Sequence, residues 1–409
     1  MNPDVDYLDA DSWDHTMKER MDWLRENDPV FWSDASKLWV LSKFEEVAFV
    51  SKNNDLFCSG QGVRPGNPVK LGLIDEDEPR HTKLRGLINR GFTPRMVKKL
   101  ESVFLQITTD AIDAVAKQGE CDFVEDIAVP LPLSLIAEMI GIRKEDRKRF
   151  HRWSDAMIAA EGNLDKPEIT AKAGESFMAY SAYVTEIIED RRANPRDDLV
   201  SILVGAKDGG LLETFEGAHA PIRADDEEYL KLANDELIKL LVLLLVAGNE
   251  TTRNGISGSM QLLIDNPEVR RQLIDAPEKI PVAVEEMLRL VTPVHSFGRT
   301  ATRDSELGGK KIEQGQTVLM LYPSANRDPD EFPDPEAFKI DRNPHHLAFG
   351  LGNHFCMGAN LARMELRVAL AEVLRRLPDM EYSSGGPVLV PSPLVRTCAE
   401  MRVKFTPEA

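Results

Sequence analysis

One cysteine stands alone in a glycine-rich segment directly before an expected helix. Cys356 lies in "HLAFGLGNHFCMG", residues 346–358, and the next run, "ANLARMELRVALAEVLRRL", has a helical period. One interpretation is a buried cysteine that acts as a small hydrophobic residue. The other is a metal ligand, because N–H groups and the positive dipole end at a helix N-terminus favour a thiolate. The glycines would let a flat ligand approach the sulfur closely, as an axial thiolate ligand of iron requires.

A second segment places an acid and an alcohol in an apolar helix. The segment "LLLVAGNETTRN" spans residues 243–254, and Glu250 interrupts its apolar face. Glycine inside a helix costs about 1 kcal/mol relative to alanine, so we expect Gly248, together with Ala247, to leave room for a ligand. The Thr251 hydroxyl can donate to the carbonyl of residue 247 and open a local groove. Plain back-bonding within the helix is the alternative.

Several charged residues have spacings that allow contacts. Glu286 and Arg289 in "EEMLR" are three apart on an expected helix and can form an ion pair. His81 and Arg85 are four apart on one face of another helix, and Arg299 follows in "PVHSFGRTA". Each of these cations alone would more often be solvated, and a surface Glu–Arg pair would add little stability.

Together these segments resemble the cytochrome P450 monooxygenases. The ten residues "FGLGNHFCMG", 349–358, resemble the haem-binding loop of that family, and "EEMLR" and "LLLVAGNETTRN" resemble two further family motifs. The resemblance implies a haem b cofactor with Cys356 as the axial ligand of its iron. It also places these residues around the haem: His81, Arg85, Ala247, Gly248, Arg299, Phe349, Gly350, His354 and Gly358.

The resemblance implies roles for other residues as well. Glu250 and Thr251 would be the acid–alcohol pair that handles protons during dioxygen activation. Glu286 and Arg289 would join Arg342 in a buried network that fixes the cysteine loop. The substrate pocket is expected to be lined by Leu73, Ile74, Val246, Ala247, Val294, Phe297 and Leu394.

The function that follows from the resemblance is hydroxylation of an apolar small molecule with O2. Electrons would come from a ferredoxin, reduced in turn by an NAD(P)H-dependent ferredoxin reductase. The motifs look most like those of members that hydroxylate sterol side chains and methyl-branched lipids, so we expect a sterol, terpenoid or branched lipid. One alternative is a peroxide-driven peroxygenase, against which the intact Glu250–Thr251 pair argues. Another is a non-catalytic haem-based binder or sensor, against which the lack of an output module argues.

The elements that must position these residues are mainly helical. Residues 79–204 have mostly helical patterns, residues 205–228 read as an exposed connection, and a long helix is expected over residues 229–264. Short strands are expected at "PVFW" with "LWVL", at "ELGGKKI" and at "QTVLMLY". We therefore predict a mainly α fold with a smaller β-rich part, as one domain over residues 1–409. The resemblance adds a triangular-prism shape and a long central helix that crosses over the haem.

The composition excludes several partners. A net charge of −18 argues against nucleic acid and anionic membrane surfaces. An electron donor would dock near the cysteine, where the side chains that offer positive charge are Arg90, Arg95, Lys98 and Lys99. The four cysteines lack CxxC spacing and fit a reducing compartment. The longest apolar run, "LLVLLLVA", is far shorter than the roughly 20 residues of a membrane span. We predict a cytoplasmic protein without a membrane anchor.

Overall fold

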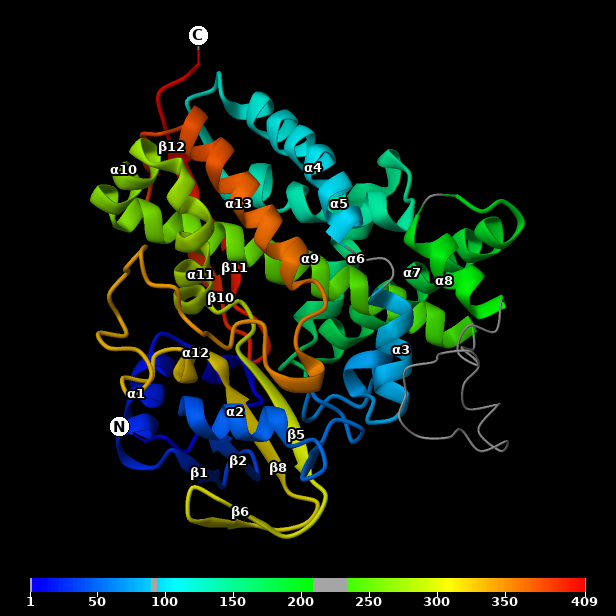
Figure 1. The fold of residues 1–409 in the computed structure, drawn as a ribbon, viewed down its shortest axis with the longest axis vertical. Coiled ribbons are helices and arrows are strands. Elements are labelled where there is room, and N and C mark those ends of the chain that lie inside the picture. The colour runs from blue at the N-terminus through cyan, green and yellow to red at the C-terminus, as the bar shows by residue number, and fades with distance from the viewer. Residues whose placement is uncertain (1, 90–93, 197, 209–233, 409) are drawn as a thin grey trace.

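The computed structural model describes residues 2–89, 94–196, 198–208 and 234–408, and helices make up most of it (Figure 1). The helices are α1 (Met17–Asn27), α2 (Phe44–Lys52), α3 (Arg80–Asn89), α4 (Pro94–Val115), α5 (Pro130–Ile140), α6 (Arg147–Ala159), α7 (Pro167–Ala193), α8 (Leu199–Asp208), α9 (Asn234–Asp265), α10 (Pro267–Asp275), α11 (Ile280–Val291), α12 (Tyr322–Ala325) and α13 (Ala359–Arg376). The mainly α prediction is confirmed.

The long helix α9 is the centre of the helical part. It runs through the middle of the helices in Figure 1 and contacts α5, α6, α7, α11 and α13. Its apolar side chains belong to the large hydrophobic core that these helices share. A helix that is covered on most sides needs an apolar middle rather than one apolar stripe, which explains the run of leucines and valines before Gly248.

The larger β-rich part lies beside this bundle, in the lower part of Figure 1, and the strands near the C-terminus lie higher in the same view. Its main sheet has the order β1-β2-β8-β5-β3, in which β2 and β8 run parallel and the other neighbours antiparallel. The expected hairpins are present as β1 with β2 and as β6 with β7. The strands are β1 (Val30–Ser33), β2 (Leu38–Leu41), β3 (Phe57–Cys58), β4 (Glu120–Asp122), β5 (Ser296–Ala301), β6 (Ser305–Leu307), β7 (Lys310–Ile312), β8 (Thr317–Leu321), β9 (Glu381–Tyr382), β10 (Val388–Val390), β11 (Thr397–Glu400) and β12 (Arg402–Lys404).

One predicted boundary differs from the structure. Helix α8 continues to Asp208, so the first four residues of the predicted connection 205–228 are helical. The rest of that connection, and residues 229–233 of the predicted long helix, lie outside the described residues. Gly205 and the glycines and acids after Asp208 are typical of a connection, but the helix of the apolar segment "LVSILVGAKD" continues to Asp208. Across the described residues, no helix combines the length and the apolarity that crossing a bilayer would need.

Candidate functional site

The cysteine loop joins the irregular segment after α12 to helix α13. Its backbone turns through Gly350 and Gly352, whose φ angles of 67° and 73° are left-handed. A Cβ on Gly352 would also collide with the carbonyl oxygen of Ser51 at the end of α2. The Cys356 N–H donates to the Phe349 carbonyl at 2.9 Å and closes the loop. Glycine is therefore required where the loop meets α2, and the turn directs the cysteine toward α13.

Cys356 lies three residues before the first residue of α13. Burial raises the pKa of its thiol, while the backbone N–H of Gly358 and the guanidinium groups of Arg85 and Arg363 act in the opposite direction. Arg85 also donates to the carbonyl of Phe355 at 2.6 Å, next to the cysteine. These groups provide the N–H donors and positive charge that a thiolate at this position needs.

The hydrogen bond predicted for Thr251 is present in α9, and both a local groove and plain back-bonding within the helix require it. The Thr251 hydroxyl donates to the carbonyl of Ala247 at 2.7 Å, so this carbonyl accepts a side-chain hydrogen bond in addition to the backbone hydrogen bonding of the helix. The reason for the neighbouring glycine differs from the prediction. A Cβ on Gly248 would lie 2.8 Å from Cδ1 of Ile136 on α5, so the missing side chain serves helix packing at least as directly as it serves the cavity.

Glu250 is fully buried and belongs to a polar network between α9 and α6. Its carboxylate accepts from Ser154 at 3.3 Å and lies 2.8 Å from the guanidinium of Arg253. Arg253 also donates to Asp155 at 2.9 Å, and the side chain of Asp155 is 42% exposed. Burial raises the pKa of Glu250 to about 7 against the opposing effect of Arg253. The network therefore connects a carboxyl group that titrates near neutral pH with the protein surface.

Four cationic or imidazole side chains converge here: His81 and Arg85 from α3, Arg299 from β5 and His354 from the cysteine loop. The rings of His81 and His354 lie 4.1 Å apart, and His354 contacts the Ser59 hydroxyl at 3.1 Å. Arg299 is buried and donates to the carbonyl of Gly298 at 2.7 Å. The Nε of Arg299 and the Nε2 of His81 are buried without a hydrogen-bond partner, and Arg299 forms no ion pair with any described carboxylate. Burial lowers the pKa of Arg299, as expected for a cation that lacks an anionic partner.

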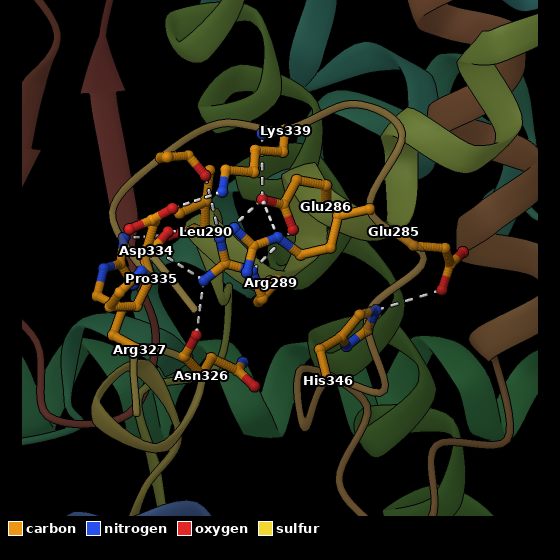
Figure 2. A network of polar contacts seen from close by, with 12 residues as sticks. Glu285, Glu286, Arg289, Leu290, Asn326, Arg327, Asp334, Pro335, Lys339 and His346 are labelled. Atoms are coloured by element: carbon orange, nitrogen blue, oxygen red, sulfur yellow. Dashed lines mark hydrogen bonds and ion pairs between the residues drawn. The ribbon is translucent and has the colours of Figure 1, made fainter. Parts of the chain in front are cut away.

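The structure brings Glu286, Arg289 and Arg342 together, and Figure 2 shows the pair of Glu286 with Arg289. Arg289 makes two 2.7 Å hydrogen bonds to the Glu286 carboxylate, and both side chains are completely buried. Arg342 lies 3.1 Å from the same carboxylate. Arg289 also donates to the carbonyl of Asn326 at 2.8 Å, and the Asn326 side chain accepts from the Leu347 N–H at the start of the cysteine loop at 2.7 Å. The network thus reaches the cysteine loop through Asn326.

All other predicted site residues line one cavity of about 560 Å³. Cys356, Glu250 and Thr251 are in its wall. The predicted haem contacts in the wall are His81, Arg85, Ala247, Gly248, Arg299, Phe349, Gly350, His354 and Gly358. The predicted substrate contacts in the wall are Leu73, Ile74, Val246, Ala247, Val294, Phe297 and Leu394. The structure brings these residues to one place, and what each of them binds remains a prediction.

Comparison with known proteins agrees with this geometry. The family model Cytochrome P450 matches residues 12–280 and 279–389. A steroid C26-monooxygenase of Mycolicibacterium smegmatis is 37% identical over 100% of this chain and 97% of its own length. The chain is a cytochrome P450. Among solved structures, CYP109E1 from Bacillus megaterium in complex with testosterone has a TM-score of 0.82 at 32% identity and covers 95% of this chain and 99% of its own. Mycobacterium marinum CYP268A2 in complex with pseudoionone has a TM-score of 0.87 at 33% identity, with 98% of each chain covered.

Membership of the family makes this P450 a monooxygenase with haem b as cofactor, and the described residues fit that group. Haem carries two carboxylates, and the unpaired donors of Arg299 and His81 are what such anions would satisfy. The cysteine on the same wall can serve as the thiolate ligand of the iron. The family also requires O2, an apolar substrate and a redox partner.

Some polar neighbours of the site were not predicted from the sequence of this P450. Arg253 is three residues after Glu250, so helical spacing alone could have identified that pair. Glu285 on α11 pairs with Arg363 on α13 at 2.7 Å and with His346 at 3.3 Å (Figure 2 shows the His346 contact), and no local spacing signals such a contact. His295 stacks on Trp13 at 4.8 Å, and it is not among the residues that line the cavity.

Proposed function

We propose that this cytochrome P450 hydroxylates a sterol, terpenoid or branched lipid with electrons from a ferredoxin and its NAD(P)H-dependent reductase. The observation that carries the proposal is the cavity, in which Cys356 and the Glu250–Thr251 pair share a wall with mostly apolar side chains. The relatives support the substrate class, since steroid C26-monooxygenases are similar over nearly their full length and two of the similar solved structures contain testosterone and pseudoionone.

The haem, held by the Cys356 thiolate and by donors such as Arg299 and His81, would supply the oxidising chemistry when it is bound. The chain's own task is then to deliver protons and exclude water. Glu250, whose pKa burial raises to about 7, can take up or release a proton at neutral pH, and the ion pairs of Arg253 with Glu250 and Asp155 hold its carboxyl group in place. Thr251, with its hydroxyl in the wall of the cavity, can hold a proton or a water beside the substrate.

The exposed part of the cysteine loop and the lysines of α4 support the ferredoxin as electron donor. Phe355, directly before Cys356, is 37% exposed, so the loop reaches the surface. Lys98 on α4 is exposed and offers positive charge to an acidic partner, and Lys99 beside it is exposed as well. The side chains of Arg90 and Arg95 lie outside the described residues. The cytoplasmic location remains a prediction.

The proposal is tested on the haem-loaded enzyme by titration with sterols, terpenoids, fatty acids and aromatic acids while the spin state of the iron is followed. We expect a complete spin shift with a sterol, terpenoid or branched lipid, and a hydroxylated product with ferredoxin, reductase and NAD(P)H. A shift only with aromatic acids would contradict the substrate class. Faster product formation with hydrogen peroxide than with ferredoxin would favour the peroxygenase alternative. A Cys356→Ala variant is expected to lose the thiolate signature of the reduced carbonyl spectrum.

A further inference from the structure

The cavity has charged residues that the proposed reaction does not use. After the predicted haem contacts and Glu250 are set aside, the charged side chains in the described part of its wall are Arg64, Glu161 and Glu365. Glu365 is on α13, is buried, and its Oε2 has no hydrogen-bond partner among the described residues. Arg64 and Glu161 come from two segments far apart in the sequence and form an ion pair with each other. Such a pair in an otherwise apolar wall requires an explanation.

The pair belongs to a compact polar cluster, hereafter the Arg64–Asn67–Glu161 cluster. The Asn67 amide donates to the same Glu161 oxygen at 2.9 Å, and Arg64 also donates to the carbonyl of Val69. The side chains of Arg64 and Glu161 are only 11% and 9% exposed. Burying a charge is costly unless the charge is paired. Arg64 and Glu161 can therefore be buried here only because they compensate each other's charge.

The cluster lies where the cavity reaches the surface. Val69 and Leu164, neighbours of Asn67 and Glu161 in the sequence, also line the cavity and are 50% and 41% exposed. Pro68 is another exposed lining residue. By contrast, Leu244 and Leu288 in the same wall are buried. A ligand that fills the cavity would therefore meet the cluster at its outer end.

The two segments that carry the cluster are anchored separately. The carboxylate of Asp75 accepts from the N–H groups of Val63 and Leu71 at 2.8 and 2.7 Å and so shapes the segment around Arg64. On the other side, the Gly162 carbonyl accepts from the Ala10 N–H at 3.0 Å. The positions of both charged side chains are thus set by contacts outside the cluster, as in a preorganised binding site.

The charges of the cluster indicate what it would bind. Arg64 and Asn67 offer N–H donors, and Glu161 offers an acceptor, so a hydroxyl or a carbonyl oxygen can be accommodated. An anionic group would gain from Arg64 but would be repelled by the adjacent Glu161 carboxylate. The compensated charge therefore favours an uncharged polar group over a carboxylate or sulfate.

We propose that the Arg64–Asn67–Glu161 cluster is a specificity determinant that holds a single uncharged polar end of an otherwise apolar substrate. The proposal rests on the proposed function and narrows its substrate class. The apolar end of the molecule is then directed inward, toward Thr251 and the cysteine loop. A free fatty acid of similar size is disfavoured because its carboxylate would meet Glu161.

The test uses the haem-loaded enzyme and two matched ligand pairs, followed by the spin-state shift. One pair is a 3-hydroxysterol and its sulfate ester, and the other is a long-chain alcohol and the fatty acid of equal length. The measured quantity is the ratio of the dissociation constants of the anionic and the uncharged member. Wild type is expected to prefer the uncharged member, and a preference for the anion would overturn the proposal.

Two variants should change this ratio in opposite directions. Glu161→Gln removes the repulsion, so the ratio is expected to fall by up to about fivefold, the effect of one charged contact at a partly screened site. Arg64→Gln leaves Glu161 uncompensated, so the ratio is expected to rise. Glu168→Gln is the matched control, because Glu168 is an exposed carboxylate seven residues after Glu161 in the sequence and does not line the cavity.

The possible outcomes are distinct. A purely structural role for the cluster would change the binding of both members equally and leave the ratio constant, which overturns the proposal. Equal changes in Glu161→Gln and Glu168→Gln would also overturn it, because they indicate a general surface-charge effect. If neither pair binds although an unrelated aromatic acid does, the proposed function fails as well, and that result is recognised in wild type before any variant is made.

Discussion

Replacing Arg289 with methionine is expected to destabilise this P450 and to loosen its cysteine loop. The substitution removes two hydrogen bonds to Glu286 and leaves that carboxylate buried with the charge of Arg342 and the backbone N–H of Lys339 as remaining partners. It also removes donors from the carbonyls of Asn326 and Pro335. The substitution therefore removes one partner of a buried ion pair and leaves the other, Glu286, in place.

The magnitude follows from this geometry. Removing one partner of a buried pair costs about 3–5 kcal/mol, and the partners left to Glu286 favour the lower value. For 409 residues, the entropy of unfolding is about 0.9 kcal/mol/K, so a loss of about 3 kcal/mol lowers Tm by about 3–4 °C. The expected loss of the thiolate-ligated form is larger than this shift alone implies, because Asn326 connects the network to Leu347 in the loop.

The assay combines thermal unfolding with the fraction of enzyme that shows the thiolate signature in its reduced carbonyl spectrum. Lys339→Met is the matched control. It removes a cation from the segment whose backbone contacts Glu286. The Lys339 side chain, however, is half exposed, and its ion pair is with the exposed Asp334. The control should change stability by less than about 0.5 kcal/mol. If Arg289→Met unfolds within about 1 °C of wild type and keeps the full thiolate signature, the reasoning about the network is wrong.

Four further predictions concern helix α9. In wild type, the amount of product formed per O2 consumed should decrease as pH rises through about 7. Burial raises the pKa of Glu250 to about 7, and above that pH the ionised carboxyl has no proton to donate. The Glu250→Gln variant should form little product per O2, and this ratio should no longer depend on pH. Because the neutral carboxyl is favoured in the folded state, the Tm of Glu250→Gln relative to wild type should rise between about pH 5 and about pH 8, and a constant difference would contradict the raised pKa. Thr251→Val should keep the spin-state shift with substrate but lower product per O2 severalfold, and unchanged coupling would refute a role in proton delivery. Gly248→Ala should destabilise by up to about 2 kcal/mol, because overpacking against Ile136 costs about 1–3 kcal/mol and alanine regains about 1 kcal/mol of helix propensity, and a second change, Ile136→Val, should recover part of the loss.

Much of this P450 could be predicted from its sequence because its defining features are local. The helix periods, the hairpins and the order of the motifs lie within short segments, and the predicted hairpins and central helix are present. The contact between Thr251 and Ala247 follows from four-residue spacing in a helix, and the bidentate pair of Glu286 with Arg289 follows from three-residue spacing. Local spacing was sufficient wherever both partners share a helix.

Contacts between distant segments could not be predicted in this way. Glu161 and Arg64 are 97 residues apart, and each looks like an ordinary surface charge in its own segment. The sequence predicts that Gly248 leaves room for a ligand, but it does not show that Gly248 also makes room for Ile136, because Ile136 comes from another helix. Whether Glu250 is a proton carrier or a static ion depends on burial and on Ser154, Arg253 and Asp155, which only the packing of α6 on α9 sets.

Contacts within one segment and contacts between distant segments serve different functions in the cavity. The segments that the reaction requires, the cysteine loop and the middle of α9, carry strong local signals because each needs particular residue types at fixed spacing. The segments that choose the substrate, such as those around Arg64 and Glu161, need only a complementary surface, which many sequences can form. The sequence therefore points clearly to the reaction and only weakly to the molecule that undergoes it. A change of Glu161 to glutamine should for this reason alter which ligand binds while the reduced carbonyl spectrum and the response to Thr251→Val stay the same, and a loss of the thiolate signature in that variant would show that the two parts of the cavity are not separable.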